Sequence, residues 1–338
     1  MNLVIAAGGT GGHIIPALAV ALLWRTKGHK VIWFGRENSM ESNIANQHHI
    51  PFYCVGAMAL GRMTKMPKNL LNISKAISKA GLLLRQHKAF CVFSTGSYAS
   101  FPTAMAAYQS GIPLFIHEQN SVMGMANKVL LPFAKGVFLG MPIWSLPQNW
   151  VVGSPLLKTP TPSNGQHLLV FAGSQAADFF NQNIPQILAK LKVKYPIIHI
   201  AGKDKELVKK AYQRNQLNAE VIDFSYDMDT LFKKSKIGIC RAGAMSLAEI
   251  AGYQLPSVVV PYQYASGDHQ TKNALMMENK NCVVVACEDI TSVEMAVAKL
   301  LVPNNWKKMR LALATPYQHG EKKIVQEISK LYARALSH

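Results

Sequence analysis

Several features are missing from this chain of 338 residues, and each absence narrows what the protein can be. Its cysteines form no CxxC pair, which argues against a zinc site and against a disulfide framework. We expect no bound metal ion and no cofactor. The scattered cysteines are Cys54, Cys91, Cys240, Cys282 and Cys287.

The chain also lacks the segments with which proteins enter or cross membranes. Its first residues, MNLVIAAGG, have neither the basic start nor the long apolar core of a signal peptide, and instead suit a buried strand. No apolar stretch is long enough to span a bilayer as a helix. We therefore expect a cytoplasmic protein, in a compartment that keeps its thiols reduced, which could still sit on a membrane surface.

Acidic residues are few, at 18 against 36 basic ones, and the formal net charge is +18. Such an excess favours an anionic partner: nucleic acid, a phosphate-bearing substrate or an anionic membrane. Charge alone does not choose among these, and a generic basic surface that confers solubility is the alternative. With 49% hydrophobic residues and 16% charged ones, the chain should be folded throughout, and its length favours two domains.

Alternating strand and helix patterns predict two successive α/β domains with parallel sheets. A helix from about Pro16 to Lys27 follows the first strand, and one from about Asp178 to Lys192 opens the second half. A linker rich in Pro, Gly and Ser covers residues 152–165. The expected strands are Leu3–Ala7, Val31–Gly35, Cys91–Ser94, Leu114–Ile116 and Gly136–Leu139, then Leu168–Ala172, Ile197–Ile200, Val221–Phe224, Ile237–Cys240, Ser257–Val260 and Cys282–Val285.

Two small-residue turns join a strand to a helix, AGGTGGH at residues 7–13 and AGSQAA at residues 172–177. Backbone N–H groups in such turns can approach an anion or a sugar closely, and Ser174 would add a hydroxyl donor. His13 would project from the helix N-terminus into a cleft, where an imidazole can act as general base. Neither turn matches GxGxxG or GxxxxGK[ST], and a purely structural tight turn is the alternative.

A third strand–turn–helix segment, CRAGAMSLAE, ends in Glu249. A carboxylate there can accept hydrogen bonds from both hydroxyls of a ribose, although it could also merely complement the helix dipole. The loop PYQYASGDHQTKNA, residues 261–274, is dense in neutral hydrogen-bonding side chains, which suits sugar hydroxyls. The alternative is a polar surface loop with Gly267 as its turn and Asp268 as a helix cap.

Taken in order, these segments resemble glycosyltransferase family 28, and within it the enzymes that add N-acetylglucosamine to lipid I to make lipid II. The resemblance runs from Gly8 to Asn273 and so covers most of the chain. It implies a GT-B fold: two Rossmann-like domains, residues 1–154 and 155–315, whose parallel sheets face a central cleft, with a last helix, 316–338, packed back on the first domain. The matching pieces are GGTGGHIIPALAVA, STGSYASFPTA, IHEQNSVMGMANK, VGSPL, FAGSQAADFFNQNIP, CRAGAMSLAE and PYQYASGDHQTKNA.

The resemblance also implies residue roles. His13 is the first candidate for the general base, followed by Glu118 and His117. Uridine would be surrounded by Ala244, Met245, Ser246, Leu247, Ala248 and Glu249, with Glu249 on the ribose. The remaining contacts would be Thr10, Gly11 and Gly12 at the transferred sugar and acceptor diphosphate, Asn120 at the N-acetylglucosamine, Ser174 at the donor phosphate, Ser225 at uracil, Gln270 at sugar hydroxyls, and Tyr98 and His117 on the acceptor side. Asn273 would also bind substrate.

The sequence departs from the family pattern at three places near phosphates. The glycine-rich loop expected before Tyr98 carries serine at Ser94 and Ser97. The second turn has Ala176 and Asp178 where the family has glycine and a cation. The linker arginine is replaced by Leu157. Each change removes flexibility or positive charge, for which Lys158 or Arg241 could compensate.

Residues 62–88 predict an amphipathic helix on the membrane side. Leu70, Ile73, Ile77, Ala80 and Leu84 share one face, which we assign to the core. The opposite face is basic with interspersed leucines, which suits an anionic bilayer, as the resemblance also implies. The alternative is a solvated basic face with two incidental leucines. The residues expected to touch the membrane are Leu71, Lys75, Lys79 and Leu82.

The sequence thus predicts an inverting transfer of N-acetylglucosamine from UDP-N-acetylglucosamine to the muramyl sugar of lipid I (undecaprenyl-pyrophosphoryl-N-acetylmuramyl-pentapeptide). It would take place at the cytoplasmic face of a bacterial inner membrane, in peptidoglycan biosynthesis, by a peripheral protein that binds no nucleic acid. The alternatives are a GT-B transferase with another nucleotide sugar or acceptor, and a non-catalytic nucleotide-sugar-binding protein. A nicotinamide-dependent oxidoreductase fits poorly, because Gly35-Arg36-Glu37 is a weak version of the acidic site that it needs.

Overall fold

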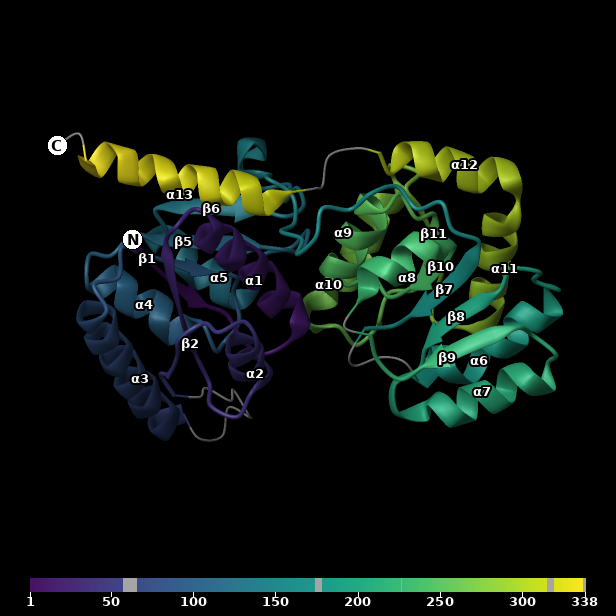
Figure 1. Ribbon diagram of the computed structural model, residues 1–338, viewed down its shortest axis with the longest axis horizontal. Helices are drawn as coiled ribbons and strands as arrows, with labels where there is room; N and C mark the ends of the chain where they lie inside the picture. The colour runs from purple at the N-terminus through teal and green to yellow at the C-terminus, as the bar shows by residue number, and fades with distance from the viewer. Residues whose placement is uncertain (57–65, 174–177, 226, 315–318, 337–338) are drawn as a thin grey trace. The chain divides into compact units, whose positions relative to one another are not determined.

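The chain forms two compact units, each built on a sheet of its own (Figure 1). The first unit comprises Met1–Leu157 and His319–His338, and the second comprises Lys158–Gln318. The structure, a computed structural model, describes residues 1–56, 66–173, 178–225, 227–314 and 319–336, without the side chains of residues 66–70, 266 and 332–336. Within these residues, none of the helices combines the length and the apolarity that crossing a bilayer requires.

The first unit has a six-stranded parallel sheet with the strand order β3-β2-β1-β4-β5-β6. Its strands are β1 (Asn2–Ala6), β2 (Lys30–Gly35), β3 (Phe52–Cys54), β4 (Cys91–Ser94), β5 (Leu114–Glu118) and β6 (Gly136–Leu139). Its helices are α1 (Gly11–Thr26), α2 (Met40–Gln47), α3 (Met66–Gln86), α4 (Phe101–Gln109), α5 (Met125–Leu130) and α13 (Gly320–Leu336), with short 3-10 turns η2 (Leu131–Phe133) and η3 (Gln148–Trp150).

Both faces of this sheet are covered by helices, because successive strand residues alternate between two apolar clusters. Leu3 and Ile5 point into the cluster formed with α1, α2 and α13. Val4 and Ala6 point into the cluster formed with α3, α4 and α5. The C-terminal helix α13 therefore belongs to the core of the first unit, where it packs against α1.

The second unit repeats this architecture with the strand order β12-β11-β10-β7-β8-β9, again all parallel. Its strands are β7 (His167–Phe171), β8 (Ile197–Ile200), β9 (Ala219–Ile222), β10 (Ser235–Cys240), β11 (Ser257–Val259) and β12 (Val283–Val285). Its helices are α6 (Asp178–Lys190), α7 (Lys205–Arg214), α8 (Met228–Lys234), α9 (Ala244–Gly252), α10 (His269–Glu278), α11 (Ile290–Leu301) and α12 (Pro303–Ala312), with 3-10 turns η4 (Gly202–Asp204) and η5 (Ser266–Asp268).

The two Rossmann-like units with parallel sheets confirm the predicted fold class. Some of the predicted boundaries of helices and strands were wrong. Helix α1 begins at Gly11 and not near Pro16, because the Thr10 carbonyl already accepts hydrogen bonds from the N–H groups of His13 and Ile14. The edge strand β3 was missed. Strand β9 ends at Ile222 and not at Phe224, whose ring is 60% exposed.

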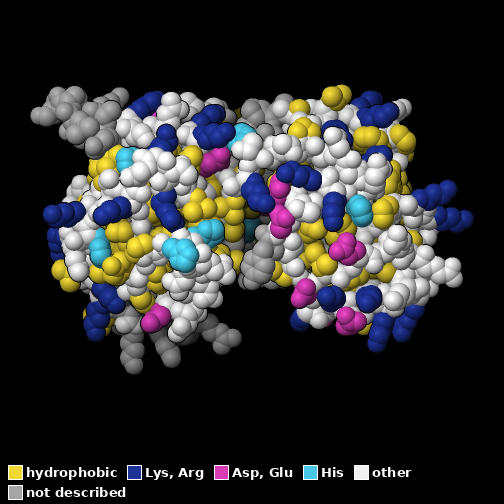
Figure 2. Space-filling model, in the orientation of Figure 1, with side chains coloured by type: hydrophobic (Ala, Val, Ile, Leu, Met, Phe, Trp, Pro, Cys, Tyr) yellow, Lys and Arg dark blue, Asp and Glu magenta, His cyan; other side chains and the backbone are white. Residues whose placement is uncertain are grey.

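The basic excess of the sequence is visible on both units. On the face that Figure 2 shows, Lys and Arg side chains are scattered over each unit, and acidic side chains are fewer. No single basic stripe of the kind that follows a nucleic-acid backbone stands out on this face.

Candidate functional site

In each unit the strand order reverses once, and this reversal selects the loops that can bind a ligand. In the first unit the chain adds β2 and β3 on one side of β1 and then returns to place β4 on the other side. In the second unit β7 and β10 stand in the same relation. Loops leaving the carboxyl ends of such neighbouring strands part in opposite directions, which leaves a crevice where ligands of open α/β sheets bind.

At the reversal in the first unit, the glycine-rich turn after β1 meets the loop after β4 through His13 and Thr95. His13 Nδ1 lies 2.9 Å from the Thr95 carbonyl oxygen, and the Thr95 hydroxyl donates to the His13 carbonyl at 2.8 Å. The buried Gln119 amide donates to the same Thr95 oxygen at 2.9 Å. Neither Thr95 nor Gln119 was predicted to act here, although each directly follows a strand, Thr95 after β4 and Gln119 after β5.

These contacts determine which nitrogen of His13 can act as a base. A carbonyl oxygen only accepts hydrogen bonds, so Nδ1 must carry the proton. The neutral ring then has its lone pair on Nε2. His13 is partly exposed next to Gly9, Thr10 and Gly12, all exposed. The imidazole is therefore held in one tautomer and remains accessible, as a general base must be.

Glu118 is occupied in holding the loop that follows β5. It is 2% exposed, and its two carboxylate oxygens accept four hydrogen bonds. Oε1 accepts from the backbone N–H and the side-chain amide of Asn120 at 3.1 and 3.0 Å. Oε2 accepts from Gly124 N and Asn127 Nδ2, both at 2.9 Å. This geometry gives Glu118 a positioning role for Asn120 and leaves it poorly placed to take a proton.

His117 lies in the core and not on a surface that an acceptor could reach. It is 0% exposed, and its Nε2 lies 3.4 Å from the Gly153 carbonyl oxygen. Burial lowers the pKa of His117 to about 4, so the ring is neutral at physiological pH. The histidine therefore fastens β5 to the start of the linker. Tyr98, by contrast, is 47% exposed on the loop after β4.

Ser97, one of the serines that replace a family glycine, keeps a glycine-like backbone with φ of +123°. Its hydroxyl is buried and has no hydrogen-bond partner among the described residues. We expect Ser97→Gly to raise the free energy of unfolding by about 1 kcal/mol, because relief of the strained φ outweighs the added chain entropy of glycine. Urea titration measures the change. Ser100→Gly, at an ordinary φ of −84°, should lower the free energy of unfolding. Equal effects of the two changes would show that the backbone of Ser97 is not strained.

In the second unit, helix α9 starts at the carboxyl end of β10 and carries the predicted uridine segment. The side chains of Ala244, Leu247 and Ala248 are buried, so these residues can offer a ligand only their backbone. Met245 and Ser246 are partly exposed. The first N–H groups of a helix lack partners within it and are available to a bound nucleotide.

Glu249 lies one turn further along α9 and is partly exposed. Among the described residues, no basic side chain lies within ion-pair distance of its carboxylate. Burial raises the pKa of Glu249 to about 7. A carboxylate desolvated without a compensating cation is costly to the protein, and such groups are typical of binding sites.

Arg241 and Lys158, expected to compensate for lost phosphate contacts, are both engaged with carboxylates. Arg241, 3% exposed at its side chain, pairs with Glu288 and stacks over Phe180 with its guanidinium carbon 4.8 Å from the ring centroid. It thereby links the segments after β10 and β12. Lys158 Nζ lies 3.0 Å from Asp227 and 3.6 Å from Asp229. The described contacts thus give both cations structural partners.

Two further predicted residues hold loops of the second unit. Gln270 Oε1 accepts from the backbone N–H of Tyr262 at 2.9 Å, and the buried Asn273 donates to the Ala242 carbonyl at 3.3 Å. They connect α10 to the loops after β11 and β10. Ser225, partly exposed, accepts from the N–H of Asp227 at 3.1 Å. Ser174 and Ala176 lie outside the described residues.

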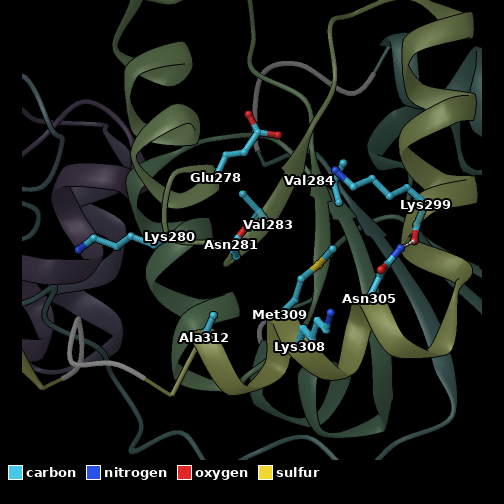
Figure 3. Close-up of a pocket in the computed structure, with 10 residues that line it drawn as sticks. All are labelled: Glu278, Lys280, Asn281, Val283, Val284, Lys299, Asn305, Lys308, Met309 and Ala312. Atoms are coloured by element: carbon cyan, nitrogen blue, oxygen red, sulfur yellow. Dashed lines mark hydrogen bonds between the residues drawn. The ribbon is translucent and has the colours of Figure 1, made fainter.

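A separate hollow in the second unit contains none of the predicted residues. It lies beside the start of β12, between α10, α11 and α12. Three lysines line it, and the side chain of Lys280 points away from those of Lys299 and Lys308 (Figure 3). Among the described residues, no group of three or more His, Cys, Asp or Glu side chains is arranged to hold a metal ion.

The chain matches the models of two domains of one enzyme family. The model of the glycosyltransferase family 28 N-terminal domain matches residues 3–139, and that of the family 28 C-terminal domain matches residues 167–328. The chain belongs to glycosyltransferase family 28. Each domain model coincides with one parallel sheet, so this family 28 chain carries both halves of the family architecture.

Relatives match most of the length of this family 28 chain. A protein of Neisseria gonorrhoeae is 36% identical over 290 residues, 81% of each chain, and one of Paraburkholderia phymatum is 36% identical over 319 residues, 87% of this chain and 84% of the relative. Both are named UDP-N-acetylglucosamine–N-acetylmuramyl-(pentapeptide) pyrophosphoryl-undecaprenol N-acetylglucosamine transferase. Among solved structures, Acinetobacter baumannii MurG matches with a TM-score of 0.80 and 26% identity, over 97% of this chain and 99% of that one.

Proposed function

We propose that this family 28 glycosyltransferase transfers N-acetylglucosamine from UDP-N-acetylglucosamine to the muramyl sugar of lipid I, with inversion at the anomeric carbon. The observation that carries the proposal is the 36% identity, over most of both chains, to relatives named for this donor and acceptor. The sites at the two strand-order reversals support it, because one presents an accessible base and the other a helix N-terminus followed by a carboxylate.

The first unit would provide the acceptor site. The acceptor hydroxyl would donate its hydrogen bond to His13 Nε2, which takes the proton as the hydroxyl oxygen attacks the anomeric carbon. The Thr95 carbonyl keeps the proton of Nδ1 in place and stabilises the imidazolium that forms. Asn120, held by Glu118, would contact the transferred sugar. Thr10, Gly11 and Gly12 would face the sugar and the acceptor diphosphate.

The second unit would provide the donor site. The first turn of α9 would offer backbone N–H groups to the uridine, and Glu249 would accept hydrogen bonds from both ribose hydroxyls. Gln270 and the Ser225 backbone would complete the contacts to sugar and uracil. Negative charge grows on the diphosphate as the bond to the anomeric carbon breaks. The proposal assigns its stabilisation to the N-terminus of α6, without a metal ion or another cofactor.

The test is a transfer assay with purified full-length protein, UDP-N-acetylglucosamine and a lipid I analogue. The proposal requires a β-linked disaccharide product and an equal amount of UDP. A panel of UDP-glucose, UDP-galactose and UDP-N-acetylgalactosamine tests the donor. Faster transfer from one of these, or tight donor binding without any product, would overturn the proposed function.

We further propose that α3 carries the membrane-contacting surface, at the cytoplasmic face of a bacterial membrane. Leu71 and Leu82 are 64% and 60% exposed, and Lys75 and Lys79 between them are exposed as well. Ala80 and Leu84, on the opposite side of the helix, are fully buried, which confirms that part of the predicted core face. The side chain of Leu70 lies outside the described residues. Exposed leucines between lysines suit an anionic headgroup layer.

Lys75→Gln with Lys79→Gln should weaken binding to anionic vesicles by about 2 kcal/mol, or roughly 30-fold, because each lysine near such a surface contributes about 1 kcal/mol. Sedimentation with phosphatidylglycerol vesicles at low salt measures it. The matched control is Lys209→Gln with Lys210→Gln on α7, which removes two exposed lysines from the second unit. Equal loss in both double variants would show that the attraction is general charge and not α3.

A further inference from the structure

A buried acidic side chain lies beneath the glycine-rich turn and takes no part in the proposed reaction. Glu41, on the first turn of α2, is 0% exposed. Its Oε2 accepts a hydrogen bond from the backbone N–H of Gly9 at 3.4 Å. Its Oε1 pairs with the guanidinium Nε of Arg36 at 3.1 Å and also receives the Arg36 backbone N–H at 3.4 Å. The two oxygens thus face donors from two different strand ends, those of β1 and β2.

The protein maintains this carboxylate in its charged form. Burial by itself would raise the pKa of Glu41, but backbone N–H groups and Arg36 outweigh it and hold the pKa below its usual range. A buried charge is tolerated only where it is paired and hydrogen-bonded, and leaving it unpaired is strongly unfavourable. Glu41 is therefore tied to the turn electrostatically and does not merely fill space.

Two glycines leave the room that this side chain needs. A Cβ at Gly8 would lie 2.5 Å from Glu41 Oε1, and a Cβ at Gly35 would lie 3.0 Å from Glu41 Cγ. Gly8 has an ordinary φ, so the close approach of Glu41, and of Ala99 at 2.9 Å, explains why a side chain is excluded there. The glycines of this segment thus serve a partner below the turn as well as ligands above it.

The contact with Gly9 acts on the start of helix α1. Gly9 has φ of +96°, and the next residue, Thr10, accepts the first hydrogen bonds of the helix from His13 and Ile14. A change in the Gly9 peptide would therefore turn the Thr10 carbonyl and move the first turn of α1. His13 lies in that turn, and its ring nitrogen must stay within hydrogen-bond distance of Thr95.

We propose that Glu41 is a positioning residue of the acceptor site: through Gly9 it holds the glycine-rich turn in the conformation that presents His13 and the N–H groups of α1 to the acceptor. The proposal rests on the proposed function above. Arg36 neutralises the carboxylate, so that the acceptor diphosphate does not meet an uncompensated negative charge beneath the turn. Arg36 has 32% of its side chain exposed and is the solvent-facing end of this network.

The test compares two substitutions of nearly equal length. Glu41→Met cannot accept the Gly9 hydrogen bond, and we expect kcat/KM for the lipid I analogue to fall by about 10- to 100-fold, as for small misplacements of catalytic groups. Glu41→Gln retains one oxygen for Gly9 while its NH2 faces Arg36, so it should recover part of that loss. Affinity for UDP-N-acetylglucosamine should stay within roughly twofold of wild type, because the proposed contacts to uridine lie in the other unit.

Ser39→Ala is the matched control. Ser39 caps the same helix by accepting from Ser42 N at 3.2 Å, and its hydroxyl donates to the Arg36 carbonyl at 2.6 Å. Its loss lowers the melting temperature but removes none of the groups that donate to Glu41. Ser39→Ala with wild-type kcat/KM, beside a slow Glu41→Met, supports the proposal. If Glu41→Met, folded and binding donor, transfers like wild type, or if Ser39→Ala is equally slow, the proposal is overturned.

Two further outcomes are also decisive. If Glu41→Met does not fold, Glu41→Gln is assayed alone, and a kcat/KM for acceptor equal to that of wild type overturns the proposal, whereas a fall with unchanged donor affinity supports it. If wild-type protein itself transfers no sugar to the lipid I analogue, the proposed function fails, and so does the role of Glu41 that rests on it. The wild-type assay thus separates the two failures.

Discussion

His13→Ala should slow transfer by roughly 10²- to 10⁴-fold, the usual contribution of a positioned general base. The imidazole, the proposed base, is partly exposed beside the strand-order reversal, and its Nδ1 is occupied by the Thr95 carbonyl 2.9 Å away. Glu118 accepts four hydrogen bonds and His117 is sealed in the core, so neither is placed to take over. Initial rates at saturating donor and acceptor measure the loss.

Donor affinity separates a loss of chemistry from a loss of binding in this variant. UDP-N-acetylglucosamine should bind His13→Ala with unchanged affinity by calorimetry, because uridine is assigned to the other unit. His49→Asn, which removes an exposed histidine from the same unit, is the control and should transfer normally. If His13→Ala turned over as fast as His49→Asn, His13 would not be the base and the proton would have to leave by another route.

Donor binding should weaken as the pH falls through about 7. In the ligand-free protein burial raises the pKa of Glu249 to about 7, so below that pH most molecules carry a neutral carboxyl group. The carboxylate accepts hydrogen bonds from both ribose hydroxyls more strongly than the neutral carboxyl group does, so binding favours release of the proton. The dissociation constant should therefore rise up to about tenfold per pH unit below 7 and level off above pH 8. Calorimetry between pH 5 and pH 9 tests this.

The choice of ligand and a matched variant isolate the effect of Glu249. UDP-N-acetylglucosamine is preferable to UDP, since its diphosphate is esterified at both ends and its charge does not change in this range. Glu249→Gln keeps the size of the side chain and cannot titrate. It should bind weakly and with little dependence on pH. A variant that kept the wild-type pH profile would exclude Glu249 as the titrating group and would place the ribose elsewhere.

Much of the proposed donor site could be predicted from local sequence, because strand, turn and helix follow one another without interruption there. The segment CRAGAMSLAE places β10, its turn and α9 in order, and Glu249 lies on the helix as its spacing predicts. The same holds for His13, which lies where the glycine-rich turn enters α1. The compensating roles expected of Arg241 and Lys158 could not be judged this way, because their partners Glu288, Asp227 and Asp229 are distant in sequence.

By itself the sequence determined two parallel α/β units, their turns and the identity of the groups that can do chemistry, since hydrophobic periodicity and helix starts are local properties. Only the tertiary structure decided which loops meet. The strand order puts Thr95 beside His13, 82 positions earlier, and Glu41 beneath Gly9. It also buries His117 and saturates Glu118 with donors. Burial and hydrogen-bond partners are long-range consequences of packing, and no pattern within a single segment contains them.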